Sequence, residues 1–240
     1  LDSGTNFDHS SFADIGGDSY DHTNPLGAGV YLGVCDVNHE QYDVTYTCND
    51  KLIGGYDFVN NDPDPIDVTT NHGTHVSHSV VGLAPEAELY VYSVCNSGCP
   101  GAAQFSALEA AMDPNGDGDI SDRVDVINMS LGGDFGTTKG GAVQEMLDNA
   151  AKLGVISAIS AGNDGATPFI VGGPSTTKNV MSVGAMTHPT TEATSVDSSF
   201  NGSEVVIAPA GFNTTNVFSF TSEETSLIFP DENQTGCDPF

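Results

Sequence analysis

Between residues 72 and 185, helical patterns alternate with short apolar segments that have the composition of β-strands. The first predicted helix spans residues 72–83, carries Val76, Val80 and Val81 along one side, and stops near Gly82 and Pro85. Residues 102–112 and 141–153 predict two further helices. Alternation of this kind favours an α/β domain, so we predict a mostly parallel, twisted sheet with helices on both faces.

Four apolar segments have the length expected of strands in such a sheet: 88–95, 125–131, 155–161 and 179–185. Segment 125–131 (DVINMSL) is almost continuously apolar, so we expect both of its faces to be covered. Residues 3–71 are mostly loop, with one strand or hairpin predicted over 51–59. We expect Leu1 to be the last residue of a strand that begins before residue 1.

The pattern changes after about residue 200. Three short β segments (204–209, 217–220 and 226–229) are separated by turns rich in Asn, Thr and Glu, and no helical pattern is present. We therefore predict a domain over residues 1–200 and the start of a second, β-rich domain over residues 201–240.

The charge of the chain restricts its partners. It has 33 Asp and Glu against five Lys and Arg, a formal net charge of −28. Nucleic acids and anionic membranes require a basic face, so neither is an expected partner. No apolar run approaches the roughly 18 residues of a membrane-spanning helix.

Five cysteines are present, at spacings that match no zinc site. In an exported protein we favour the local pairs Cys35–Cys48 and Cys95–Cys99. The alternative is that all of them are reduced and buried. Cys237 is left over, which suggests a partner beyond the last residue.

Three polar motifs follow predicted strands or open a helix: Asp2-Ser3-Gly4, the segment 71–76 (NHGTHV) and the segment 160–165 (SAGNDG). Sites in parallel α/β sheets form at the carboxyl ends of the strands, so the three motifs suggest one site. Their chemistry suits acyl transfer. Asp2 can orient His72, His72 can take a proton from a serine, and the amide of Asn163 can donate to an oxyanion.

The motifs DSG, NHGTHV, DVINMSLGG (125–133) and SAGNDG, in this order, resemble those of the subtilisin-like serine peptidases, the subtilases, over residues 1–200. The resemblance implies a secreted, monomeric serine endopeptidase that acts on proteins or peptides. It makes Asp2 the catalytic aspartate, His72 the general base and Asn163 the oxyanion residue. It implies a substrate-binding strand and a roomy, apolar pocket for the substrate residue before the scissile bond; the residues concerned are Ser130, Leu131, Gly132, Gly133, Ala161 and Gly162.

One departure from the family pattern concerns the nucleophile. The GTSMA-like serine motif is absent, so we expect the serine to lie beyond residue 240 and this chain alone to be inactive and poorly folded. Residues 201–240 resemble the start of a protease-associated (PA) domain, which some subtilases insert before that serine. An unrelated β-rich insertion is the alternative. A second hypothesis is an inactive homologue that binds peptides; an aspartic protease would need a second D-[ST]-G motif, which the chain lacks.

An acidic segment between the second helix and the next strand carries oxygen ligands at alternate positions, with Gly118 at the sixth position of the loop. This spacing resembles an EF-hand-type calcium loop, although Val124 replaces the final glutamate. We predict a structural Ca²⁺ site; an acidic turn is the alternative, and no organic cofactor is expected. We also expect His75 to be a packed structural residue. The proposed ligands are Asp113, Asn115, Asp117, Asp119 and Asp122.

Overall fold

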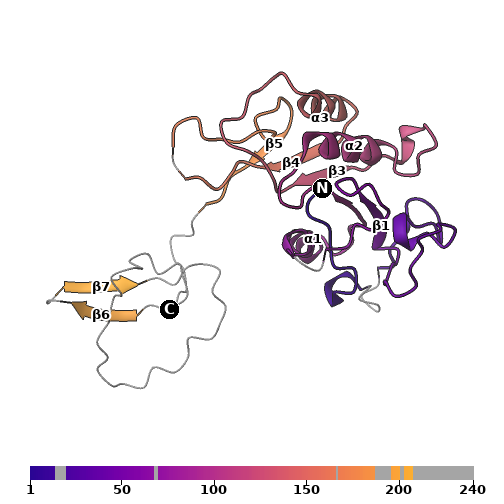
Figure 1. Cartoon of the computed structure of the whole chain (residues 1–240), viewed down its shortest axis with the longest axis horizontal. Helices are drawn as coiled ribbons and strands as arrows, with labels where there is room; N and C mark the ends of the chain where they lie inside the picture. Colours follow the sequence, from indigo (N-terminus) through magenta and orange to yellow (C-terminus); the bar gives the residue numbers. More distant parts are fainter. Residues whose placement is uncertain (14–19, 68–69, 166, 187–195, 201–202, 208–240) are drawn as a thin grey trace, which may run out of the picture. The chain divides into compact units, whose positions relative to one another are not determined.

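The computed structural model describes residues 1–13, 20–67, 70–165, 167–186, 196–200 and 203–207 (Figure 1). The chain divides into two compact units, Leu1–Met186 and Thr187–Phe240. All three predicted helices are confirmed, each within one residue of its expected ends. They are α1 (His72–Leu83), α2 (Gly101–Met112) and α3 (Ala142–Lys152).

A two-stranded parallel sheet forms the first half of the larger unit, from β1 (Leu52–Asp57) and β2 (Leu89–Ser93). One face packs with Val81 of α1 and with the short 3₁₀ helices Ser10–Phe12 and Gly33–Cys35. From the other face, Tyr92 joins the core around Leu108 of α2. Helices therefore lie on both faces of this sheet, as predicted.

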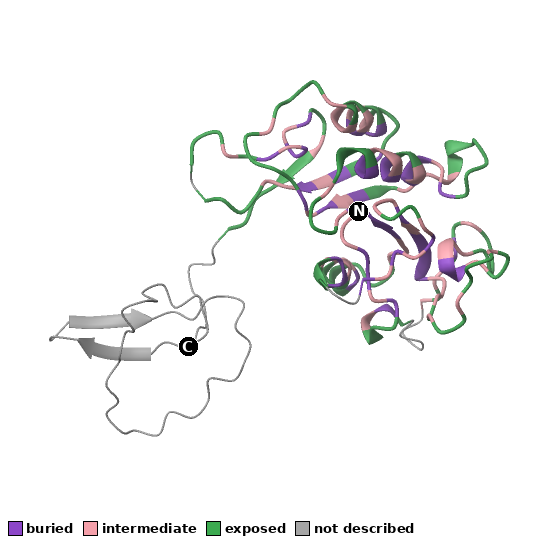
Figure 2. Ribbon diagram, in the orientation of Figure 1, coloured by how far each residue is buried: buried purple, intermediate pink, exposed green. Residues whose placement is uncertain are grey.

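A second parallel sheet contains β3 (Val126–Met129), β4 (Ile156–Ser160) and β5 (Met181–Val183). Helices α2 and α3 lie on one side of it (Figure 1). Ile127 of β3 is 2% exposed, whereas its neighbour Val126 is 58% exposed. The expectation that this strand is covered on both faces is therefore wrong for the described residues, because α2 and α3 cover only one face (Figure 2).

Residues 1 and 2 lie between the two sheets. The Leu1 amino group donates to the Asn128 carbonyl of β3 at 3.0 Å, and the Asp2 N–H donates to the Tyr92 carbonyl of β2 at 3.1 Å. Asp2 thus bridges to Ser93 in parallel fashion at the carboxyl end of β2. This is the place in a parallel sheet where the ends of neighbouring strands converge on a site.

Both predicted disulfides are confirmed, Cys35–Cys48 and Cys95–Cys99. The second closes the loop that follows β2. Among the described helices, none is both long and apolar enough to cross a membrane.

Within the unit Thr187–Phe240, β6 (Val196–Phe200) and β7 (Ser203–Ile207) form an antiparallel pair. The apolar pattern of the sequence predicts a strand close to β7 but none at β6. The other two β segments predicted after residue 200, and Cys237, lie outside the described residues. The assignment of 201–240 to a separate inserted domain stays a prediction.

Candidate active site

Asp2 and His72 are in direct contact although 70 positions separate them. His72 Nδ1 lies 2.6 Å from Asp2 Oδ1, which also accepts the Ser3 N–H at 2.7 Å. Asp2 Oδ2 is buried and has no hydrogen-bond partner within the described residues. A carboxylate held in this way fixes the orientation of the imidazole and leaves its Nε2 directed away from Asp2.

Two glycines allow the segments of Asp2 and His72 to approach each other. A Cβ at residue 73 would lie 1.9 Å from the Gly4 carbonyl oxygen, and a Cβ at residue 4 would lie 2.4 Å from the Pro65 carbonyl oxygen. Gly4 also has a φ of +100°, which side chains disfavour. The Gly73 N–H donates to Ser3 Oγ at 3.0 Å and joins the two segments. The glycines of the DSG and NHGTHV motifs therefore serve the contact between the carboxylate and the imidazole.

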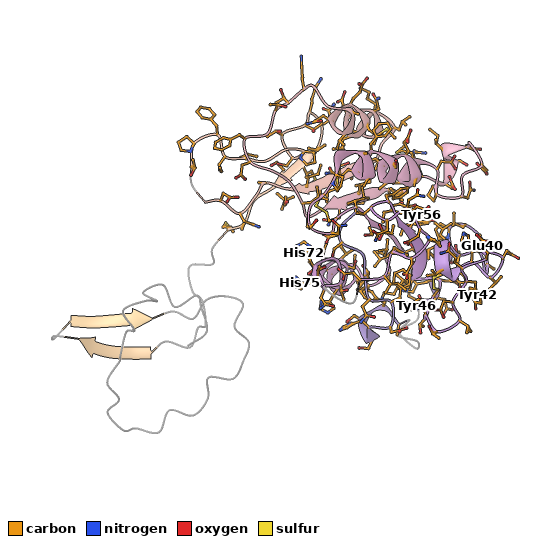
Figure 3. The ribbon with its side chains drawn as sticks, viewed as in Figure 1. Glu40, Tyr42, Tyr46, Tyr56, His72 and His75 are labelled. Carbon is orange, nitrogen blue, oxygen red and sulfur yellow. A yellow bond between two sulfur atoms is a disulfide. The ribbon has the colours of Figure 1, made fainter. Side chains whose placement is uncertain are left out.

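The two partners differ in exposure. The His72 side chain is 56% exposed, while that of Asp2 is 13% exposed. The imidazole can therefore meet a substrate while the carboxylate stays shielded behind it. His75 lies close to His72 on α1 (Figure 3) and is also exposed, so the expectation that His75 is packed in the interior is wrong.

A cavity of about 350 Å³ connects this pair to the third motif. Asn163 follows β4 in an exposed loop and lines the same cavity as His72 and Asp2. The structure therefore brings the three residues predicted to be catalytic to one cavity.

Five of the six residues predicted to bind substrate line this cavity: Ser130, Leu131, Gly132, Gly133 and Gly162. Ala161 is not among the lining residues. Its N–H donates to the Val183 carbonyl of β5 at 2.8 Å, and its carbonyl accepts the Gly172 N–H at 3.0 Å. Ala161 therefore connects β5 to Gly172, which lines the cavity. Sequence reasoning missed several lining residues that approach through tertiary contacts, among them Cys95, Asn96, Cys99, Asp134, Asp164 and Gly172.

The acidic loop after α2 is ordered by its own side chains. Asp113 accepts the backbone N–H groups of Asp117 and Gly118, and Asp117 accepts that of Asp119. Carboxylate and amide oxygens of this kind suit Ca²⁺ chemically. However, no group of three or more His, Cys, Asp or Glu residues is arranged to hold a metal ion in the described part of the chain.

Asp122, the last proposed ligand, lines a different cavity, together with Tyr90. Both of its carboxylate oxygens are buried without a hydrogen-bond partner among the described residues. Burial, with the charges of Asp122 and Glu88, raises the pKa of Tyr90 to about 12. Among the described residues no three of the proposed aspartate ligands are grouped as a metal site requires, and calcium binding stays a prediction.

Comparison with known proteins identifies the family. A family model described as the subtilase family matches residues 1–236. The chain belongs to the subtilase family. The match includes most of residues 201–240, where an inserted domain is predicted.

Individual relatives are identical to the chain at about a third of the aligned residues. The minor extracellular protease Vpr of Bacillus subtilis is 30% identical over 219 residues, which cover 84% of this chain and 26% of Vpr. Subtilisin E of the same organism is 35% identical over 57% of this chain and 36% of its own length. A thermophilic serine proteinase of Bacillus sp. is 35% identical over 60% of this chain and 36% of its own length.

The chain thus spans between about a quarter and a little over a third of the length of these relatives. A solved structure, the S41 psychrophilic protease, covers 87% of this chain at 22% identity with a TM-score of 0.49, the match spanning 56% of that chain.

Proposed function

We propose that this subtilase chain supplies the aspartate, histidine and oxyanion asparagine of a serine endopeptidase that hydrolyses peptide bonds in proteins. The observation that carries the proposal is the contact of 2.6 Å between His72 Nδ1 and Asp2 Oδ1, at the edge of a cavity that Asn163 also lines. The extracellular protease and the subtilisins among its relatives support the same activity.

In this mechanism His72 takes the proton of a serine hydroxyl as the serine oxygen attacks the carbonyl carbon of the substrate. Asp2 holds the imidazole in the required tautomer and stabilises the imidazolium. Asn163 donates to the oxyanion of the tetrahedral intermediate. His72 then gives the proton to the leaving amine, and a water molecule releases the acyl group by the same steps in reverse order.

The nucleophile is proposed to come from a segment outside residues 1–240. Among the described residues, three serines line the cavity, and each hydroxyl group is hydrogen-bonded to another part of the chain: Ser3 accepts from the Gly73 N–H, Ser130 accepts from the Asn128 side chain, and Ser160 donates to the Leu131 carbonyl. The exposed apolar face of the second sheet, which includes Val126 and Met181, offers a surface on which further polypeptide can pack. We therefore expect activity only in a polypeptide that joins residues 1–240 to such a serine, called here the serine-containing polypeptide.

The substrate main chain is proposed to lie along Ser130–Gly132 as an added strand. These residues follow the end of β3 and line the cavity. Pairing through the backbone tolerates many substrate sequences, because the main-chain donors and acceptors are the same in every peptide.

Removing the Asn163 amide tests the oxyanion role. In the serine-containing polypeptide we expect Asn163→Ala to lower kcat by about 10²- to 10³-fold with little change in KM, which is the loss known for the corresponding oxyanion asparagine of subtilisin, a member of the same family. The measurement is steady-state hydrolysis of a peptide anilide. An unchanged kcat, or a loss confined to KM, would show that Asn163 does not stabilise the transition state.

The calcium proposal has its own test. If Ca²⁺ binds the loop 113–122, millimolar Ca²⁺ should raise the Tm of the protein, because a ligand that binds only the folded state stabilises it. Asp117→Asn should reduce this rise, whereas Glu109→Gln, on the exposed side of α2, should not. An equal rise in both variants, or no rise in the unmodified protein, would contradict a site in this loop.

A secreted location is also proposed. Two disulfides within residues 1–186 favour an oxidising compartment, since cytosolic thiols are normally kept reduced. The word extracellular in the name of the relative Vpr supports the same location. A monomeric state and the assignment of residues 201–240 to a PA domain stay predictions.

A further inference from the structure

Two carboxylates that line the candidate active-site cavity have no part in the proposed mechanism. Asp134 follows the predicted substrate-binding segment, and Asp164 directly follows Asn163. Both lie on the wall of the cavity that contains His72. The lining residues in the described part of the chain include no lysine or arginine. This part of the cavity wall therefore carries negative charge with no basic residue opposite it among the described lining residues.

Backbone hydrogen bonds hold the wall that carries Asp134. Gly133 and Gly173 exchange two hydrogen bonds, at 2.9 and 2.8 Å, and the Gly136 N–H donates to the Val171 carbonyl at 2.9 Å. On the other side, Ser160 Oγ donates to the Leu131 carbonyl at 3.1 Å, which joins the end of β4 to the same segment. The two carboxylates thus project from segments that are connected to each other.

Asp134 and Asp164 line the same cavity, close enough for the charge of one to act on the ionisation of the other. Desolvation, then a side-chain hydrogen bond with Asp164 and the charge of Asp164, raise the pKa of Asp134. Two carboxylates in contact repel each other when both are ionised. A cation placed between them would remove this repulsion and gain two favourable interactions.

The glycines of the same wall leave room for a long side chain. At Gly133 and at Gly162 an added Cβ would meet no atom within 4 Å. Asn163, the proposed oxyanion donor, is adjacent to Asp164 in sequence. The substrate residue whose carbonyl approaches Asn163 is the one before the scissile bond, so its side chain is the one that can reach the acidic pair.

We propose that Asp134 and Asp164 select substrates with lysine or arginine immediately before the scissile bond. This inference rests on the proposed peptidase function and names its substrate class. Guanidinium and ammonium groups can bind both carboxylates at once, which an apolar or acidic side chain cannot do. The excess negative charge of the chain would also attract basic peptides in general, so the test must separate position from charge.

The test measures binding of fluorescent tetrapeptide amides to the 240-residue chain by anisotropy, which needs no serine nucleophile. The peptides are Ala-Ala-Pro-Lys, Ala-Ala-Pro-Arg and Ala-Ala-Pro-norleucine, and the charge-matched control is Lys-Ala-Pro-norleucine. We expect a final Lys or Arg to bind about tenfold more tightly than either norleucine peptide. Asp134→Asn and Asp164→Asn should each reduce this preference about fivefold, the scale of an exposed ion pair. Glu109→Gln, which removes the same charge from exposed α2, should leave it unchanged.

The outcomes separate the two proposals. Equal binding of Lys-Ala-Pro-norleucine and Ala-Ala-Pro-Lys, or a preference that survives both aspartate substitutions, overturns the selection by the acidic pair and leaves the peptidase proposal standing. If no peptide binds to the folded chain, the proposed function fails as well. Circular dichroism establishes folding of each variant. If any form does not fold, the same preferences are measured as kcat/KM ratios in the serine-containing polypeptide.

Discussion

Replacing His72 by alanine in the serine-containing polypeptide is expected to lower kcat by about 10⁶-fold, the loss known for the equivalent change in subtilisin. The reason is that His72 both removes the proton of the serine and returns it to the leaving amine. Without the imidazole neither transfer has a catalyst, while the oxyanion donor and the bound substrate still provide some acceleration. KM should change little, because the substrate main chain is held by other residues.

His75→Ala is the matched control for this prediction. His75 lies one helical turn further along α1 and is exposed like His72, but it is not among the residues that line the candidate active-site cavity. Its replacement should leave kcat within about twofold, as is usual for surface changes. Comparable losses in the two variants would indicate that the helix as a whole, and not the His72 imidazole, supports activity.

Replacing Asp2 by asparagine is expected to lower kcat by about 10⁴-fold, again on the scale known for serine proteases. An asparagine is nearly the same size as an aspartate, so the contact with His72 Nδ1 should persist. The amide N–H can donate a hydrogen bond to Nδ1, whereas the carboxylate only accepts one, so asparagine favours the wrong tautomer of the imidazole. It also removes the charge that stabilises the imidazolium.

Asp21→Asn, the same chemical change at an exposed position, serves as the control. Pre-steady-state measurement of acylation isolates the step that Asp2 should affect. Retention of more than about a tenth of the unmodified rate in Asp2→Asn would contradict the role proposed for the carboxylate, given the far larger loss expected.

The helices of the first unit could be predicted from the sequence because their signals are local. Periodic valines, Gly82 and Pro85 define α1, and the alanine-rich and amphipathic patterns define α2 and α3. The contact between Asp2 and His72 was predictable for a related reason. The glycines that permit it, Gly4 and Gly73, are adjacent to the functional residues in their own motifs.

The acidic wall of the cavity could not be predicted in the same way. Asp134 and Asp164 are 30 positions apart, and their place on one cavity wall depends on the pairing of Gly133 with Gly173 and on the bond from Ser160 to Leu131. None of these bonds has a local sequence signal. The glycines of the motifs predict a roomy pocket, but a glycine gives no information about the charge of neighbouring side chains.

Exposure of the second sheet was misjudged for a different reason. The apolar composition of β3 and β4 reports that both faces are suited to burial, but not which elements cover them. In the described structure α2 and α3 cover the face of Ile127 and Ile159, while Val126 and Ile156 remain exposed. The apolar composition thus shows that both faces of these strands could be buried, but in the described structure only one face is buried.

The hypothesis of an inactive, peptide-binding homologue makes a distinct prediction from that of a peptidase. Binding through Ser130–Gly132 requires neither the imidazole of His72 nor the carboxylate of Asp2. The close approach of these two groups, with two glycines committed to it, favours the peptidase. Kinetics of the two variants above separate the hypotheses, since a binding protein would show no turnover to lose.

The central claim is that Asp2, His72 and Asn163 surround one reacting carbonyl, and a crystal structure of the serine-containing polypeptide with a peptidyl boronic acid tests it most directly. We expect boron bound to a serine oxygen, His72 Nε2 within hydrogen-bonding distance of the boronate, and the Asn163 amide about 3 Å from the oxygen that mimics the oxyanion. A boronate bound at a serine far from His72, or an Asn163 side chain directed away from it, would contradict the account.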